Sequence, residues 1–237
     1  MDRYSSVVLS AVLAFAAAGM ASAETITIRS GQVGGVPGAP GQPDDTVRFW
    51  NNNPPGAPLS AVPFTPANFA AASAGAAATV ITPVGAWIPF LPGDPAARWI
   101  DFATIPGSPF GESGSCLYAV PFIVTTPGAT SANLSMEFSV DDGAGDFVYG
   151  GPNPSFLYVN GVNMGALSPA NFLAASTHSQ SIPVSTGLNT IYLYQRDQGL
   201  GVSGMIFSLS MEIVPAPGAG AAMLMAASGL IGSRRRR

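Results

Sequence analysis

The chain has 237 residues, of which 47% are hydrophobic and 9% are charged, and its formal net charge is −4 at pH 7. It contains no lysine, which excludes a P-loop lysine, a Schiff-base lysine and a Ser-x-x-Lys nucleophile. The acidic balance argues against nucleic-acid partners, which need a basic surface. The single cysteine, Cys116, leaves no intrachain disulfide, and its apolar neighbours predict a buried, inert thiol.

Residues 1–23 have the pattern of a secretory signal peptide. Arg3 supplies a positive charge, residues 7–19 are apolar, and Ala21 and Ala23 form the small-residue site that signal peptidase cleaves. We therefore expect an exported protein whose mature chain begins at Glu24. Four arginines and twelve acidic residues remain between positions 24 and 217, so the mature protein has a net charge of −8.

The middle of the chain consists of short segments rich in β-branched and aromatic residues, separated by Pro, Gly, Asn and Asp. In residues 132–141, apolar side chains alternate with polar ones at the period of a strand with one buried face. Residues 31–43, rich in Gly and Pro, are expected to form a surface loop. The pattern predicts an all-β protein, an antiparallel sandwich in a single domain over residues 24–214. The expected strands lie near 25–30, 46–51, 78–82, 97–104, 116–125, 132–141, 155–160, 181–184, 188–196 and 203–214.

Two similar stretches, 65–73 and 168–176, interrupt the strands with helical signals. Each begins with a capping hydroxyl, from Thr65 or Ser168, and continues with proline at the first helical position. The sequence therefore predicts one or two short helical turns. Because the flanking residues differ, we interpret the similarity as repeated use of one capping pattern and not as a duplicated domain.

Several motifs between residues 97 and 214 follow one another in a recognisable order. They are Arg98-Trp99-Ile100, the strand 116–124, the strand 134–140 followed by Asp141-Asp142, the segment 156–161 ending in Asn160-Gly161, and the segment 187–194. Asn160 and Gly161 are suited to the positive φ angles of a tight hairpin turn. This order resembles a galactose-binding-like jelly roll, the fold of many carbohydrate-binding modules. The resemblance implies a jelly-roll sandwich and carbohydrate as a ligand class.

Asp141, Asp142 and Asp146 place three carboxylates on a Gly-rich turn. Carboxylate oxygens are the ligands that Ca²⁺ prefers, so these residues are a candidate calcium site. The alternative is a solvated turn without a metal. His178, the only histidine, lies in a polar run that is expected to be an exposed loop. A transition-metal site and a catalytic residue are therefore not expected.

Trp50 and Tyr149 border Asn- or Gly-rich turns, which makes them candidates for stacking on a sugar ring. Trp99 and Tyr194 lie instead within strand patterns and are expected in the core. The sequence thus separates two candidate ligand contacts from two aromatic residues with a structural role.

Residues 215–237 form a three-part ending. Pro215, Ala216 and Pro217 break the last strand, an uncharged apolar segment follows, and the chain closes with Arg234, Arg235, Arg236 and Arg237. This ending resembles the bacterial PEP-CTERM sorting signal, with Ala216 where that family has glutamate. The resemblance implies transient insertion into the inner membrane, cleavage by an exosortase-like enzyme, and release to the cell surface or extracellular matrix. An ordinary membrane anchor is the alternative.

These patterns together predict a non-enzymatic surface or extracellular-matrix protein that associates with exopolysaccharide. The alternative hypothesis is a carbohydrate-binding module with a specific glycan ligand and Ca²⁺ as the candidate cofactor. An esterase or glycosidase is the weakest hypothesis, because nothing in the sequence indicates the pair of carboxylates that glycoside hydrolysis requires.

Overall fold

The computed structural model describes residues 23–52, 56–165, 167, 171–199 and 201–215. Of the predicted processing residues, Ala21 and those from Ala216 to Arg237 lie outside this part of the chain, whereas Ala23 and Pro215 lie within it. No helix in the described ranges is long and apolar enough to cross a membrane.

Strands dominate the described residues, and the helix α2 interrupts them once. In chain order the elements are β1 (Thr25–Arg29), β2 (Gln32–Val33), β3 (Val36–Pro37), β4 (Pro43–Trp50), α2 (Pro66–Ser73), β5 (Ala77–Val80), β6 (Ile100–Asp101), β7 (Cys116–Val124), β8 (Ser131–Asp141), β9 (Gly143–Ala144), β10 (Leu157–Val159), β11 (Val162–Asn163), β12 (Ser176–Pro183), β13 (Gly187–Arg196) and β14 (Gly204–Val214).

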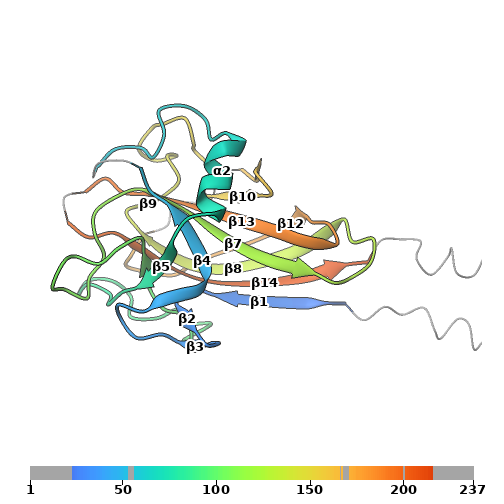
Figure 1. Cartoon of the computed structure of the whole chain (residues 1–237), viewed down its shortest axis with the longest axis horizontal. Coiled ribbons are helices and arrows are strands. Elements are labelled where there is room, and N and C mark those ends of the chain that lie inside the picture. Colours follow the sequence, from blue (N-terminus) through green and yellow to red (C-terminus); the bar gives the residue numbers. More distant parts are fainter. Residues whose placement is uncertain (1–22, 53–55, 166, 168–170, 200, 216–237) are drawn as a thin grey trace, which may run out of the picture.

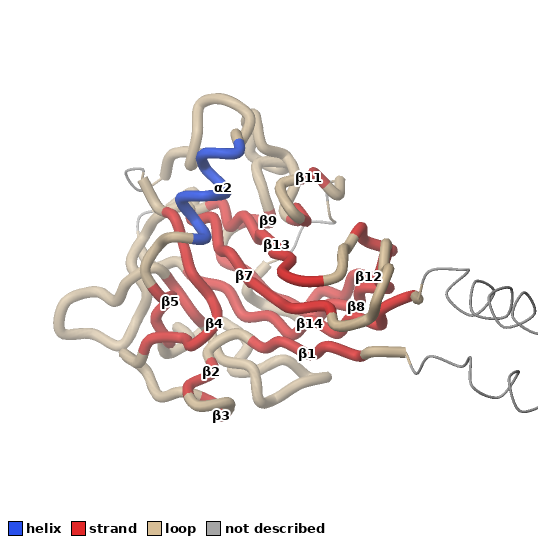
Figure 2. Tube along the Cα trace, turned by 45° about the vertical axis from the view of Figure 1, so that its right-hand side comes forward, coloured by secondary structure: helices blue, strands red, loops and turns tan. Residues whose placement is uncertain are grey.

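The long strands form two antiparallel layers (Figures 1 and 2). One layer has the order β12-β8-β14-β1, and the other has the order β10-β13-β7-β4. The short strands β5 and β6 join the layers along one edge. From β7 onward the main strands alternate between the layers, which is the connectivity of a jelly roll. The predicted antiparallel jelly-roll sandwich is therefore confirmed.

The main core lies between the two layers and is built from the inward-facing residues of β7, β8, β10, β13 and β14. The alternation predicted for β8 is confirmed, since Leu134, Met136 and Phe138 are at most 2% exposed. Cys116 is also buried, and burial raises the pKa of its thiol well above the usual range. Trp99 and Tyr194 are buried as predicted.

Two local predictions were wrong and a third was right in part. Residues 31–43 lie mostly at the surface as predicted, but they contain the short hairpin β2–β3, whose close turn is made by Gly34 and Gly35 at positive φ. Only β6 forms within the expected strand 97–104, because only Ile100 and Asp101 pair with β5 or β14, and the backbone N–H of Arg98 donates instead to the carbonyl of Ser30 at 2.9 Å. The expected strand 181–184 begins already at Ser176, so His178 lies in β12 and not in a loop. All of β12 pairs with β8, which places its polar residues in a regular strand.

The helical signal of residues 65–73 is confirmed by α2, which packs on β4 and β7 (Figure 2). The side-chain Oδ1 of Asn68 accepts a hydrogen bond from the backbone N–H of Thr65 at 2.8 Å and caps the first turn. The related stretch 168–176 differs. Residues 168–170 lie outside the described residues, and Asn171 pairs with Ala174 across a tight turn instead of starting a helix.

The carboxylate of Glu24 ties the two layers together at the end where β1 begins and β14 ends (Figure 1). Its oxygens accept hydrogen bonds from the backbone N–H groups of Thr125, at 2.9 and 3.0 Å, and Thr126, at 2.8 Å. Its own carbonyl accepts a hydrogen bond from the N–H of Ile213 at 2.8 Å. The bond from Thr125 is the main reason that the pKa of Glu24 lies below its usual value.

We expect Glu24→Ala to lower the melting temperature at pH 7, because two backbone N–H groups lose their acceptor. The lowered pKa of Glu24 means that this stabilisation is present above about pH 4.3 and is lost as the pH falls through the folded-state pKa. Melting curves of the variant and the wild type should therefore converge in acid. Glu212→Ala, at an exposed position on β14, is the matched control. Identical melting temperatures for Glu24→Ala and the wild type at pH 7 would contradict this role.

Candidate functional site

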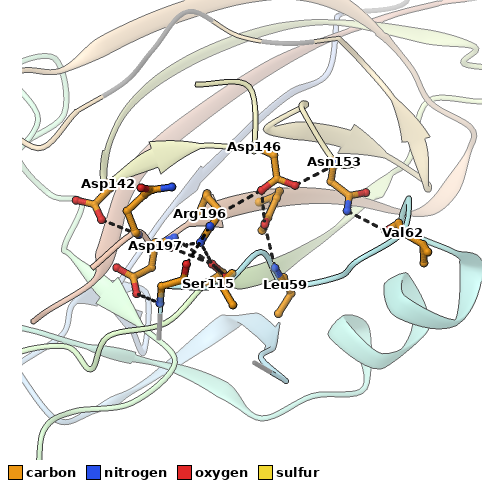
Figure 3. A network of polar contacts seen from close by, with 12 residues as sticks. Leu59, Val62, Ser115, Asp142, Asp146, Asn153, Arg196 and Asp197 are labelled. Carbon is orange, nitrogen blue, oxygen red and sulfur yellow. Dashed lines mark hydrogen bonds and ion pairs between the residues drawn. The ribbon is translucent and has the colours of Figure 1, made fainter. Parts of the chain in front are cut away.

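A buried ion pair lies where several loops meet at one end of the sandwich (Figure 3). Arg196 ends β13, and its Nε lies 3.3 Å from Oδ1 of Asp146, with side chains 5% and 0% exposed. Nε has no hydrogen-bond partner among the described residues, so the contact is electrostatic. Burial is the main cause that raises the pKa of Asp146 above its usual value, and the charge of Arg196 opposes this shift.

Asp146 connects its own loop to the segment that precedes α2. Its Oδ1 accepts a hydrogen bond from the Tyr194 hydroxyl at 2.9 Å, and its Oδ2 accepts one from the N–H of Asn153 at 3.1 Å. The Tyr194 oxygen in turn accepts the N–H of Leu59 at 3.1 Å. The side chain of Asn153 accepts the N–H of Phe64 at 2.7 Å and donates to the carbonyl of Val62 at 3.1 Å.

Arg196 fixes the other end of the same segment. Its Nη2 donates to the carbonyl of Gly56 at 3.1 Å, and its Nη1 donates to Ser115 Oγ at 3.2 Å and to the carbonyl of Asp197. The Ser115 hydroxyl donates to the carbonyl of Ala57 at 2.7 Å. Residues 56–64 are therefore held at both ends by hydrogen bonds that depend on the Asp146–Arg196 pair.

The segment held in this way carries Phe64 into a cluster of aromatic rings. The Phe64 ring centroid lies 5.0 Å from that of Tyr194, 5.8 Å from Tyr158, 6.0 Å from Phe69 and 6.4 Å from Trp50, all in edge-on arrangements. Such geometry is favourable for aromatic pairs. The cluster covers the outer face of β7, β10 and β13, and α2 packs over it with Phe69 and Ala72.

A groove with a volume of about 420 Å³ opens between α2 and the hairpin β10–β11. The hairpin turn has φ values of 51° at Asn160 and 81° at Gly161, which confirms the tight turn predicted there. A Cβ atom added at Gly161 would lie 3.3 Å from the Phe69 ring. The turn therefore approaches α2 closely. The groove is lined by Phe64, Pro66, Phe69, Ala70, Asn160, Gly161, Val162 and Tyr192.

The groove has few polar side-chain groups, and hydrogen bonds to neighbouring residues hold them in place. Asn160 Oδ1 accepts the N–H of Thr190 at 2.9 Å, and its Nδ2 donates to Asn189 Oδ1 at 3.0 Å. The Tyr192 hydroxyl lies 2.9 Å from Ser73 Oγ. No lining residue is an acid or a base with a charge at neutral pH. The size and mainly apolar lining are typical of small-molecule sites with a few orienting polar groups.

The structure separates the two aromatic residues selected from the sequence. Trp50 lies at the end of β4 and packs edge-on against Phe64, so it contacts a groove residue but does not line the groove itself. Tyr149 lies in the loop after β9, is 37% exposed, and donates to the carbonyl of Asp142 at 3.3 Å. It does not line the groove.

The three carboxylates of the candidate calcium site also divide. Asp141 and Asp142 are neighbours, and burial is the main cause that raises the pKa of Asp141 to about 8. Oδ2 of Asp142 accepts the N–H of Gln198 at 2.8 Å. Asp146 points instead to Arg196 and Tyr194. In the described part of the chain no group of three or more His, Cys, Asp or Glu residues could hold a metal ion, and calcium binding stays a prediction.

The sequence did not reveal Phe64, Phe69 and Tyr192 as groove residues. The helix start at Thr65 and the turn at Asn160 were each recognisable, but the groove exists only because these distant segments meet. A second groove of about 390 Å³ lies between β1 and β7, and Phe122 is its one aromatic lining residue. Phe122 is 5% exposed, and Phe69 and Tyr192 in the first groove are each 7% exposed. The two grooves therefore differ in the number of aromatic lining residues, which is three in the first and one in the second.

No protein-family model and no curated protein sequence matches the chain. Solved structures with a partly similar fold include a family 35 carbohydrate-binding module from an environmental isolate, at 17% identity and a TM-score of 0.33 over 59% of this chain and 89% of that one. A family 35 module from Clostridium thermocellum has 11% identity and a TM-score of 0.31 over 56% and 90%. The Podospora anserina GH26-CBM35 β-(1,4)-mannanase has 15% identity and a TM-score of 0.33 over 59% of this chain. The match spans 26% of that mannanase. Likeness at this level carries no information about a ligand.

We expect Arg196→Met to lower the free energy of unfolding by about 3–5 kcal/mol, because Asp146 would remain buried without its counter-charge. Adding Asp146→Leu to this variant should restore part of the loss, since both charges are then removed. Urea unfolding of the two variants measures both effects. Arg48→Met, at a position without an ion pair in the described ranges, is the control. A loss no larger than that of the control would contradict the role of the pair.

Proposed function

We propose that the protein is a non-enzymatic carbohydrate-binding module that holds a small neutral glycan in the groove between α2 and β10–β11. One observation carries the proposal: Phe64, Phe69 and Tyr192 line a cavity of about 420 Å³ together with the amide of Asn160. Aromatic rings suit the C–H face of a sugar ring, and an amide both donates to and accepts from its hydroxyls.

Charge supports a neutral ligand. The groove lining has no carboxylate, guanidinium or imidazole group, and the predicted mature chain has a net charge of −8. An acidic glycan would therefore meet repulsion from the protein as a whole and no cation in the groove. The lining also lacks the two carboxylates that a glycosidase uses, which favours binding without hydrolysis.

The site of action in this proposal is the cell surface or extracellular matrix. It is supported by the signal-peptide pattern of residues 1–23 and by the resemblance of residues 215–237 to the exosortase sorting signal. In the fold, Thr25 of β1 pairs with Glu212 of β14, so the described processing residues Ala23 and Pro215 adjoin the same end of the sandwich. Neither Ala23 nor Pro215 lines the groove, so we expect processing to leave the groove intact. A protein retained at the cell surface or in the matrix would have its groove next to exopolysaccharide.

The mass of the protein recovered from the native cell surface or medium tests the processing. We expect a species that begins at Glu24 and ends near Pro217, because both signals are then removed. A species that retains Arg234 to Arg237 would show a plain membrane anchor and contradict sorting, without affecting the groove.

A blocking substitution tests the binding site. Ala70 is exposed on α2 and lines the groove, so Ala70→Trp should fill the groove without disturbing the core. We expect it to weaken binding to neutral polysaccharides at least about ten-fold in affinity electrophoresis, the loss typical of a blocked central contact. Ala67→Trp is the matched control, because Ala67 is exposed on the same helix outside the groove.

Equal binding by Ala70→Trp and Ala67→Trp would contradict the groove as the site. A loss of binding on Tyr149→Ala, with Ala70→Trp unaffected, would move the site to the loop after β9.

A further inference from the structure

We infer that the groove prefers 6-deoxyhexoses, sugars that carry a methyl group where ordinary hexoses carry a hydroxymethyl group. The inference rests on the proposed function and specifies the class of sugar that the same groove takes. It follows from the chemistry of the groove rims and from the few hydrogen-bonding positions left inside.

Both rims of the groove carry exposed apolar groups, and on the hairpin side the exposed Asn160 lies beside them. On the α2 side the exposed groups are the ring of Pro66 and the methyl of Ala70. On the facing side, Val162 in β11 is 55% exposed. It therefore presents an apolar side chain to the proposed sugar ligand. A sugar methyl group between these rims would move out of water and into contact with alkyl groups, and this transfer is favourable. A hydroxyl in the same place would lose part of its hydration, and the side chains of Pro66, Ala70 and Val162 offer it no hydrogen bond in return.

The polar groups of the groove have little capacity left. The Asn160 amide has two acceptor and two donor positions, and one of each is used by Thr190 and Asn189. The Tyr192 hydroxyl already shares a hydrogen bond with Ser73. These groups can serve about two ligand hydroxyls. A sugar with one hydroxyl fewer and one methyl more therefore matches the groove better than a hexose does.

Matched sugar pairs test the inference directly, because each pair differs only in the oxygen at C6. The pairs are the methyl glycosides of L-fucose and L-galactose, of L-rhamnose and L-mannose, and of 6-deoxy-D-glucose and D-glucose. We expect at least one 6-deoxy member to bind about five-fold more tightly than its partner in calorimetric titrations of the wild-type protein, from burial of the methyl group.

Val162→Thr is the informative variant, since threonine keeps the branched shape and adds a hydroxyl at an exposed position. Val162→Thr should bring the ratio of the two affinities, 6-deoxy sugar to hexose, down toward one. Ala70→Trp should abolish binding of both members. Ala67→Trp should change neither.

Two failures are distinguishable. If hexoses bind as tightly as their 6-deoxy partners, and Ala70→Trp still abolishes binding, the preference is wrong and the groove remains a glycan site. If no sugar binds, or if binding does not respond to Ala70→Trp, the proposed function fails and the preference fails with it.

Discussion

Arg196 and Asp146 bury opposite charges at the end of the sandwich, and each makes the burial of the other tolerable. Around them, Tyr194 and Asn153 carry hydrogen bonds onward to Leu59, Val62 and Phe64. A buried pair of this kind adds little net stability compared with apolar packing, but it demands one arrangement of its partners. The requirement for one arrangement of hydrogen-bond partners explains how residues 56–64, which have no regular secondary structure, hold Phe64 in a fixed place.

The groove follows from how the sandwich covers its outer faces. Alternation along β13 turns Leu193 inward, and it turns Tyr192 and Tyr194 outward. Outward aromatic residues would leave an apolar face in water, and α2 with its preceding segment covers most of that face. The groove lies where this cover ends against the hairpin β10–β11, so its aromatic walls are an extension of the packing beneath it.

The parts that could be predicted from sequence are those with a local cause. Period-2 alternation identified β8, and the Asn160-Gly161 and Thr65-Pro66 pairs identified a turn and a helix start. The first half of β12 was missed because His178 and Gln180 stand where apolar residues would mark its inner face. Trp50 was predicted to contact the ligand because it borders a polar turn. Trp50 does not line the groove, whereas Phe64, against which it packs, does. No local pattern reports that residues 64–70 and 160–162 meet, since their contact depends on the packing of the whole layer.

The central claim is that a neutral glycan binds between α2 and β10–β11, and amide chemical-shift mapping tests it most directly. Spectra of the protein would be recorded during titration with neutral oligosaccharides. The account predicts that the largest shifts occur at Ala70, Asn160, Gly161 and Val162, which line the groove. Shifts confined to residues 147–151, or the absence of any saturable shift, would contradict it.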